Sequence, residues 1–325
     1  MAADIQVIIG EARTQATAAL SADSLQALEK HRAVFDRARI ATPRANPVNV
    51  FVYHYPVPAE ASKISYADIR MDQGAFDYDK IIEHCLVAAH SRGADVHVYL
   101  VTSAEFGRQF RHPRLAVVAL DVDPVAPMYE RVRAMAAYMR SSAFDADTAF
   151  LDGDAFANRS LKPVFQCPFD VAVTYRGDAG LMPINEGVIF AAHARPAAAS
   201  AFFDSYVATY DKLIGHPPIV AHYGDIRRWR GGQLTLNALT CPLGVPSEID
   251  AAEVFGAHVR YLPCHGFNFS MEGGQKYSAE ELDTKYVLHL KGPRKSFLDA
   301  IAKFQLSRMG AERVSVREQQ IPQAV

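Results

Sequence analysis

The chain has 325 residues, of which 50% belong to the hydrophobic set and 22% are charged, and its formal net charge is -2. This composition excludes an intrinsically disordered chain, which would have few apolar residues and a large net charge. It also excludes the overall basic charge of a nonspecific nucleic-acid binder. No stretch approaches the ~18 apolar residues of a transmembrane helix, and the first residues lack the basic start of a secretory signal. We therefore expect neither a transmembrane segment nor a nucleic-acid partner.

The four cysteines are far apart in the sequence and form no C-x-x-C pair. Zinc sites made of cysteines usually contain such pairs. Four cysteines in a chain of this length are also too few for a disulfide scaffold. We expect reduced thiols and a cytoplasmic location.

The first 45 residues have the pattern of amphipathic helices. Between Asp23 and Phe35 the apolar residues recur at helical spacing, and Pro43 and Pro47 end the segment. We expect residues 1–45 to form an N-terminal helical extension that packs on the main domain. Contact with another subunit or with a membrane surface is the alternative use of this extension.

From Val48 onward, apolar runs alternate with helical patterns. We expect strands at 48–55, 96–101, 115–120 and 148–151, with a helix after the first strand and another after the third. This alternation predicts βαβ units, and hence an α/β fold with a mostly parallel sheet that is covered by helices.

After Asp154 the periodicity is less regular. We expect further strands at 171–175, 187–191, 258–262 and 286–289, and helices at 197–213, 232–240 and 295–308. The sequence contains no repeat and no linker between separable domains. We therefore expect one α/β domain over residues 46–309 and a polar C-terminal tail over residues 310–325.

The pattern Asp-x-Asp occurs three times, beginning at Asp121, Asp145 and Asp152. Two carboxylates one residue apart after a strand can bind one hard divalent cation, which relieves their mutual repulsion. The first pattern runs into a proline and the second precedes its strand, so we expect turns there. Asp152 and Asp154 follow a predicted strand, at the sheet edge where α/β proteins bind ligands. Gly153 between them lets the backbone approach a ligand closely.

Three later motifs stand in a fixed order behind this pair. Asn185–Gly187 is a polar corner that leads into an apolar strand, Gly232–Gln233 begins a helix, and His289–Lys295 follows the last strand. Together with the Asp-x-Asp pair, these elements resemble the GT-A-fold glycosyltransferases, especially the family of bacterial lipopolysaccharide galactosyltransferases and glycogenin. The resemblance covers residues 48–297.

The resemblance implies a single GT-A domain with a Rossmann-like, mostly parallel central sheet. It implies that Asp152, Asp154 and His289 bind Mn²⁺ or Mg²⁺, and that the ion bridges the two phosphates of a nucleotide-sugar donor. Lys295 and Lys291 would neutralise the remaining charge of the diphosphate. A divalent ion and a lysine stabilise the negative charge on a departing diphosphate without any proton donor.

Further contacts with the donor are implied in the same way. Tyr53 and His54, at the end of the first strand, would seat the nucleotide base, and Gly292 would bring the backbone close to a phosphate. Arg133, on the helix before the metal-binding strand, would lie near the donor phosphates or sugar. Arg131 is an equal candidate for that role.

Asn185 and Gln233 match positions that contact the donor sugar and the reacting face, and with Glu186 they are our candidate catalytic residues. The sequence departs from the family at three points: a glycine precedes Gln233 where the family has Asp, Glu186 stands where the family often has Ser, and Ser296–Phe297 replaces the Pro-Trp that usually follows the lysine. Glu186 is therefore expected to contact the sugar or the acceptor. Trp229 and Asn268 are further candidate acceptor contacts.

The implied function is metal-dependent transfer of a sugar, with retention, from a nucleoside-diphosphate sugar (UDP is the expected nucleotide) to a glycan or other small acceptor. Two alternatives compete. Ala149–Asp154 also looks like the first motif of haloacid-dehalogenase phosphatases, with Asp152 as the nucleophile, although Phe156 stands where that motif has Thr or Val. The missing family aspartate keeps open a protein that binds nucleotide sugars without catalysis.

Overall fold

The computed structural model describes residues 2–41, 45, 47–58, 63–66, 69–72, 75–177, 182–241, 251–272, 275–308 and 315–317. The strands are β1 (Val48–Tyr53), β2 (Lys63–Tyr66), β3 (Ile69–Asp72), β4 (Val96–Thr102), β5 (Leu115–Ala119), β6 (Asp147–Asp152), β7 (Ala155–Ala157), β8 (Val171–Tyr175), β9 (Ile184–Ala191), β10 (Ala251–Val254), β11 (Ala257–Pro263) and β12 (Val287–His289). The α-helices are α1 (Ala2–Thr14), α2 (Ala22–Ala38), α3 (Tyr78–His90), α4 (Ala104–Gly107), α5 (Pro127–Met139), α6 (Pro196–Ile214), α7 (Pro217–Tyr223), α8 (Gly231–Thr240), α9 (Cys264–Phe267), α10 (Ala279–Asp283) and α11 (Leu298–Leu306). Two 3₁₀ helices, Lys162–Gln166 and Gly292–Phe297, complete the described elements.

The central sheet has eight strands in the order β10-β11-β8-β9-β6-β1-β4-β5. Strands β6, β1, β4 and β5 are parallel, and β11 is parallel to β8. Strand β9 is antiparallel to both of its neighbours, and β10 is antiparallel to β11. A small antiparallel sheet joins β12 to β7. The predicted α/β fold with a mostly parallel, helix-flanked sheet is thus confirmed.

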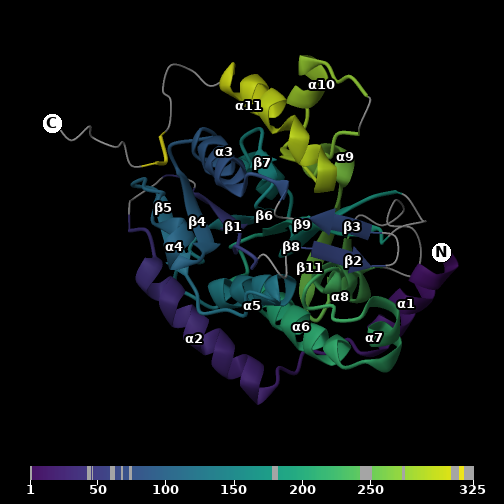
Figure 1. Cartoon of the computed structure of the whole chain (residues 1–325). Helices are drawn as coiled ribbons and strands as arrows, with labels where there is room; N and C mark the ends of the chain where they lie inside the picture. Colours follow the sequence, from purple (N-terminus) through teal and green to yellow (C-terminus); the bar gives the residue numbers. More distant parts are fainter. Residues whose placement is uncertain are drawn as a thin grey trace.

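Helices cover both faces of the sheet (Figure 1), with α2, α5, α6 and α8 on one face and α3 on the other. Strand β1 shows why its sequence is apolar apart from Asn49. Val48, Val50 and Val52 belong to the core on one face, whereas Phe51 and Tyr53 belong to the core on the other. A strand buried on both faces needs apolar side chains at nearly every position.

The N-terminal helices are part of the core. Leu28 and Phe35 of α2 are fully buried, and Ile8 of α1 joins the same cluster. The Phe35 ring lies 6.0 Å from that of Phe51 and 5.5 Å from that of Tyr138, measured between centroids. Helix α2 therefore packs against α5 and the sheet, and α1 packs against α8 and α7.

We expected Asn185–Gly187 to form a polar corner before a strand. This expectation is wrong, because Asn185 lies within β9. Val173 of β8 pairs with Ile189, but the next residue, Thr174, pairs with Asn185, so residues 186–188 have no partner on β8. The Thr174 hydroxyl bridges the irregularity, 3.1 and 3.3 Å from two backbone carbonyls. Irregularities of this kind redirect side chains near functional sites.

Two other segments differ from expectation. The region expected to be one helix over 295–308 consists of the 3₁₀ helix Gly292–Phe297 followed by α11. Within the polar tail, residues 315–317 are described. Val316 is buried, and the backbone of Arg317 pairs with that of Phe110 in an isolated antiparallel β-bridge. The rest of the tail lies outside the described residues.

All four cysteines are free thiols. Across the described parts of the chain, no helix is both long enough and apolar enough to cross a membrane.

The packing of α2 gives a first prediction. Phe35→Ala removes a fully buried ring and should lower the free energy of unfolding by about 3–5 kcal/mol. Urea denaturation of the purified protein measures this value. Leu25→Ala, at a position of the same helix that is 43% exposed, is the matched control and should change it by less than about 0.5 kcal/mol. Equal effects of the two substitutions would contradict the packing described here.

Candidate active site

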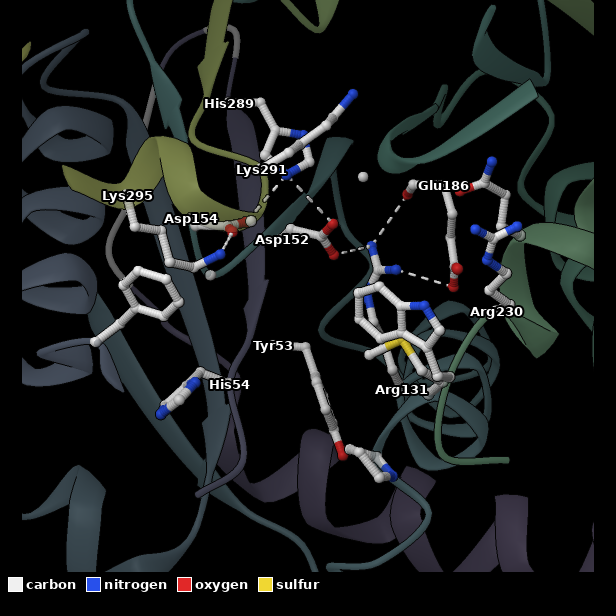
Figure 2. A pocket seen from close by; sticks show the side chains of 18 of the residues that line it. Tyr53, His54, Arg131, Asp152, Asp154, Glu186, Arg230, His289, Lys291 and Lys295 are labelled. Atoms are coloured by element: carbon white, nitrogen blue, oxygen red, sulfur yellow. Dashed lines mark hydrogen bonds and ion pairs between the residues drawn. The ribbon is translucent and has the colours of Figure 1, made fainter. Parts of the chain in front are cut away.

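A cleft of about 910 Å³ opens where β1 and β6 end. Tyr53 and Asp152 are the last residues of these two strands, and they lie side by side in the parallel register. Both residues line the cleft (Figure 2). This is the carboxyl edge of the sheet, where open α/β folds bind ligands.

Asp152, Asp154 and His289 meet in this cleft. Strand β12 pairs with β7 so that His289 lies opposite Ala155, which brings the imidazole to the two carboxylates. Its Nε2 atom lies 3.0 Å from Asp154 Oδ1 and 3.6 Å from Asp152 Oδ2. One ligand atom from each of the three residues lies within 4.8 Å of the others. The arrangement can hold a metal ion.

Gly187 makes room for this cluster. A Cβ atom at that position would lie 2.2 Å from His289 Cε1 and 2.9 Å from Asp152 Oδ2. No side chain is tolerated at such distances, because both contacts are far inside van der Waals separation. The irregular segment of β9 therefore requires glycine where it passes the cluster.

Asn268 fixes the orientation of the His289 ring. Its side-chain amide donates to Thr174 Oγ1 at 2.9 Å and to Asn185 Oδ1 at 2.6 Å, so that its own oxygen faces His289 Nδ1 at 2.8 Å. That oxygen only accepts, so the network assigns the imidazole proton to Nδ1. The lone pair of Nε2 then points at the two carboxylates. Burial lowers the pKa of His289, which favours this neutral form.

The position of Asn268 corrects the expectation of an acceptor contact. The residue is fully buried and does not line the cleft. Its contacts make it a support for His289 and Asn185.

Arg131 connects two acidic residues of the site. Its guanidinium lies 3.0 Å from Asp152 Oδ1 and 2.9 Å from Glu186 Oε1, and it donates to the Glu186 carbonyl at 3.1 Å. The structure does not bring Arg133 to the cleft. That side chain pairs with Glu130 at 3.0 Å and lies over the Tyr129 ring. Residues two positions apart on a helix point to nearly opposite sides, so only one of the two arginines can face the cleft.

Glu186 is buried beside Arg131. Burial raises the pKa of Glu186 to about 7; the charge of Arg131 opposes this shift, and that of Asp152 adds to it. Its carboxylate fills the space next to the start of α8, because a Cβ atom at Gly232 would lie 2.1 Å from Glu186 Oε1. Gln233 follows in the first turn of α8 and lines the cleft.

Two lysines approach the cluster after β12. The Lys295 ammonium forms an ion pair with Asp154 Oδ2. Burial disfavours the charged carboxylate, but the charge of Lys295 is the largest cause that opposes this and lowers the pKa of Asp154. Lys291 is half-buried, and burial is the main cause that lowers its pKa to about 8. Gly292 lies between them with a φ of 55°, a conformation that favours glycine.

An aromatic pocket occupies the side of the cleft next to Lys295. The His54 ring stacks on Tyr78 with centroids 4.7 Å apart and lies 4.8 Å from Phe106. The Lys295 ammonium lies 5.3 Å from the centre of the Phe76 ring. Burial lowers the pKa of His54 to about 4, so its ring is neutral at physiological pH. Sequence analysis missed Phe76, Tyr78 and Phe106, because no motif marks them.

Gly153 and Asn185 also lie at the cleft. A Cβ atom at Gly153 would lie 2.9 Å from Ile82 Cδ1, so the glycine permits close packing below the carboxylates. The Asn185 side-chain oxygen accepts from Gly187 N at 3.2 Å. Trp229, the candidate acceptor platform, lines the cleft as well. The structure thus gathers every predicted site residue at the cleft except Arg133 and Asn268.

The chain matches no family model and no curated protein. Among solved structures, it resembles the galactosyltransferase LgtC in complex with donor and acceptor sugar analogues, with a TM-score of 0.44 and 11% identity over 80% of this chain and 95% of that chain. It also resembles the glycosyltransferase GlyE of Streptococcus pneumoniae, with a TM-score of 0.47 and 13% identity over 81% of this chain and 61% of that chain.

A third similar structure, the inositol-1-phosphate CTP transferase from T. maritima, has a TM-score of 0.39 and 9% identity over 84% of this chain and 100% of that chain. Two of these three structures are glycosyltransferases, and all three TM-scores are below 0.5.

Proposed function

We propose that this protein is a metal-dependent glycosyltransferase that moves a sugar from a nucleoside-diphosphate sugar to a glycan or other small acceptor. One observation carries the proposal: at the carboxyl edge of the sheet, two carboxylates, an oriented imidazole and a buried lysine meet next to an aromatic pocket. The two carboxylates and the imidazole suit a divalent ion, the lysine suits a phosphate, and the pocket suits a nucleotide base.

The donor set fits a divalent ion. With its proton on Nδ1, His289 presents the Nε2 lone pair to Asp154 Oδ1 at 3.0 Å. Two facing lone pairs repel each other unless a cation lies between them. One nitrogen and two carboxylate ligands suit Mn²⁺ as well as Mg²⁺. A divalent ion bound there would stabilise the negative charge that develops on the departing diphosphate.

The side chains of this chain would then act as follows. Lys295 binds the diphosphate and adds positive charge where the leaving group forms. The neutral ring of His54 and the Tyr78 ring offer stacking surfaces to the base, for which we propose uracil. Base–aromatic stacking contributes about 1–3 kcal/mol per base. Arg131 holds Asp152 in place through their ion pair.

We further propose that Asn185, Glu186 and Gln233 orient the donor sugar and its reacting carbon, with retention of the anomeric configuration. Asn185 and Gln233 line the cleft next to the metal ligands. Arg131 places the Glu186 carboxylate between the cluster and α8. Positioning of reactants in this way contributes a large part of enzymatic rate enhancement.

The metal-binding role of Asp152 is directly testable. Asp152→Asn keeps the size of the side chain but removes a charged ligand, so transfer should fall by about 10²–10³ and metal-dependent donor binding should be lost. Steady-state transfer assays and calorimetry with UDP and Mn²⁺ measure both effects. Asp121→Asn is the matched control, because Asp121 begins another Asp-x-Asp pattern but pairs with Lys30 at the surface. Full activity of the Asp152 variant would refute its assignment as a ligand.

The nucleotide and the reaction class can be tested together. In a thermal-shift panel of UDP-, GDP-, ADP- and CMP-sugars, we expect UDP-sugars to raise Tm only when Mn²⁺ is present. Stabilisation by UDP-sugars without transfer or donor hydrolysis would favour the non-catalytic binding protein. Hydrolysis of an aryl phosphate without any effect of nucleotide sugars would favour the phosphatase.

The support that Asn268 gives to His289 predicts a separate effect. Asn268→Ala should weaken Mn²⁺ binding by about 10–100-fold, because a metal-binding histidine loses its orienting partner. Asn268→Asp retains an oxygen for Nδ1 and should lose less. Asn158→Ala removes another buried asparagine, one that bonds to the Leu282 and Lys285 carbonyls. That control should lower Tm without changing the Mn²⁺ affinity measured by calorimetry, and an equal loss of affinity in it would contradict the role of Asn268.

A further inference from the structure

The cleft holds more positive charge than its carboxylates balance. Apart from Arg230, which has a contact of its own, the described residues that line it include five Lys or Arg and three Asp or Glu: Arg131, Arg176, Lys291, Arg294 and Lys295 against Asp152, Asp154 and Glu186. A divalent ion offsets the two negative charges of a nucleoside-diphosphate sugar, so the two together add no net charge. The surplus therefore remains when the donor is bound.

Part of the surplus comes from Arg176 and Lys291, which both line the cleft. Arg176 follows β8 and Lys291 follows β12, and the short helix α9, which begins at Cys264, packs against both strands. The charge of each residue lowers the pKa of the Cys264 thiol, although burial dominates and raises it. Within the described residues, neither side chain has a carboxylate at ion-pair distance. The Arg176 Nε atom is buried and has no hydrogen-bond partner there. Two neighbouring cations in a half-buried site are unfavourable unless an anion joins them.

Lys291 and Lys295 approach the cluster of Asp152, Asp154 and His289 from different sides. Lys295 reaches Asp154 from the side of the aromatic pocket, whereas Lys291 lies beside His289 (Figure 2). The donor phosphates already have Lys295 and the metal ligands. Arg176 and Lys291 are thus placed for a second substrate rather than for the nucleotide.

We propose that Arg176 and Lys291 bind a carboxylate or phosphate group of the acceptor, so that the acceptor is an anionic molecule. This inference rests on the proposed glycosyl transfer and names the substrate class of the same cleft. Arginine suits this task because its planar guanidinium binds carboxylates and phosphates through two parallel hydrogen bonds. The inference also changes the role of Lys291, which sequence analysis placed on the donor diphosphate.

Trp229 provides the measurement. It is the only tryptophan of the chain and it lines the cleft, so its fluorescence reports occupancy. The protein is first saturated with UDP and Mn²⁺ and then titrated with methyl glucuronide, with the neutral methyl glucoside and with inorganic phosphate. We expect the glucuronide and phosphate to bind at least about tenfold more tightly than the glucoside, as charge-assisted hydrogen bonds imply.

The variants locate the effect. Arg176→Gln and Lys291→Gln should each reduce the preference for the anionic probes about tenfold, while Arg176→Gln leaves the affinity for UDP and Mn²⁺ unchanged. Arg108→Gln is the control, because Arg108 is 69% exposed and pairs with Glu105 outside the cleft. That control should retain the full preference.

Three results would overturn the inference: no preference for the anionic probes, an equal loss in the Arg108 variant, or competition between phosphate and UDP for one site. A preference for UDP-glucuronate over UDP-glucose that depends on Arg176 would also overturn it, because the anion would then belong to the donor sugar. Failure of the proposed function gives a different result: UDP and Mn²⁺ do not bind, while phosphate titrated alone still reports on Arg176 and Lys291.

Discussion

The close approach of two carboxylates, Asp152 and Asp154, is the constraint on which the rest of the site depends. Like charges this close are costly, and each carboxylate is balanced by a basic group from a different part of the chain. Arg131 of α5 pairs with Asp152, and Lys295 pairs with Asp154. His289 reaches both carboxylates because β12 pairs with β7. The small sheet, α5 and the turn after β12 are thereby tied to the end of one strand.

A second constraint is space. The side chains of Asp152 and His289 lie so close to β9 that a Cβ atom at Gly187 would collide with them. Since β9 loses its regular pairing with β8 at that point, the amides of Asn185 and Asn268 can link the strand to His289. The same irregularity that interrupts the sheet therefore holds the imidazole in one tautomer. The irregular backbone of β9 and the orientation of the His289 ring therefore depend on each other.

Local sequence patterns predicted the strands and the polar residues at their ends. They could not predict which side of a helix faces the cleft or which distant residues come into contact. The strands before Asp152 and His289 are apolar runs with polar residues at their ends, and the family resemblance then indicated Asp152, Asp154 and His289 as candidate ligands. The choice between Arg131 and Arg133 could not be made, because α5 is buried around most of its circumference and its apolar pattern does not indicate which side faces the cleft. The aromatic pocket and the Asn268 network join residues that are far apart in sequence and carry no motif.

Glu186 and Gly232 compete for one volume, since a Cβ atom on the glycine would collide with the carboxylate. The two positions are therefore coupled: an acidic side chain can stand at one of them only when the other is small. Any chain that moved its acid from the strand to the helix would have to shorten residue 186 in the same step. Exchange at this pair would shift a negative charge from one wall of the cleft to another without altering the total charge.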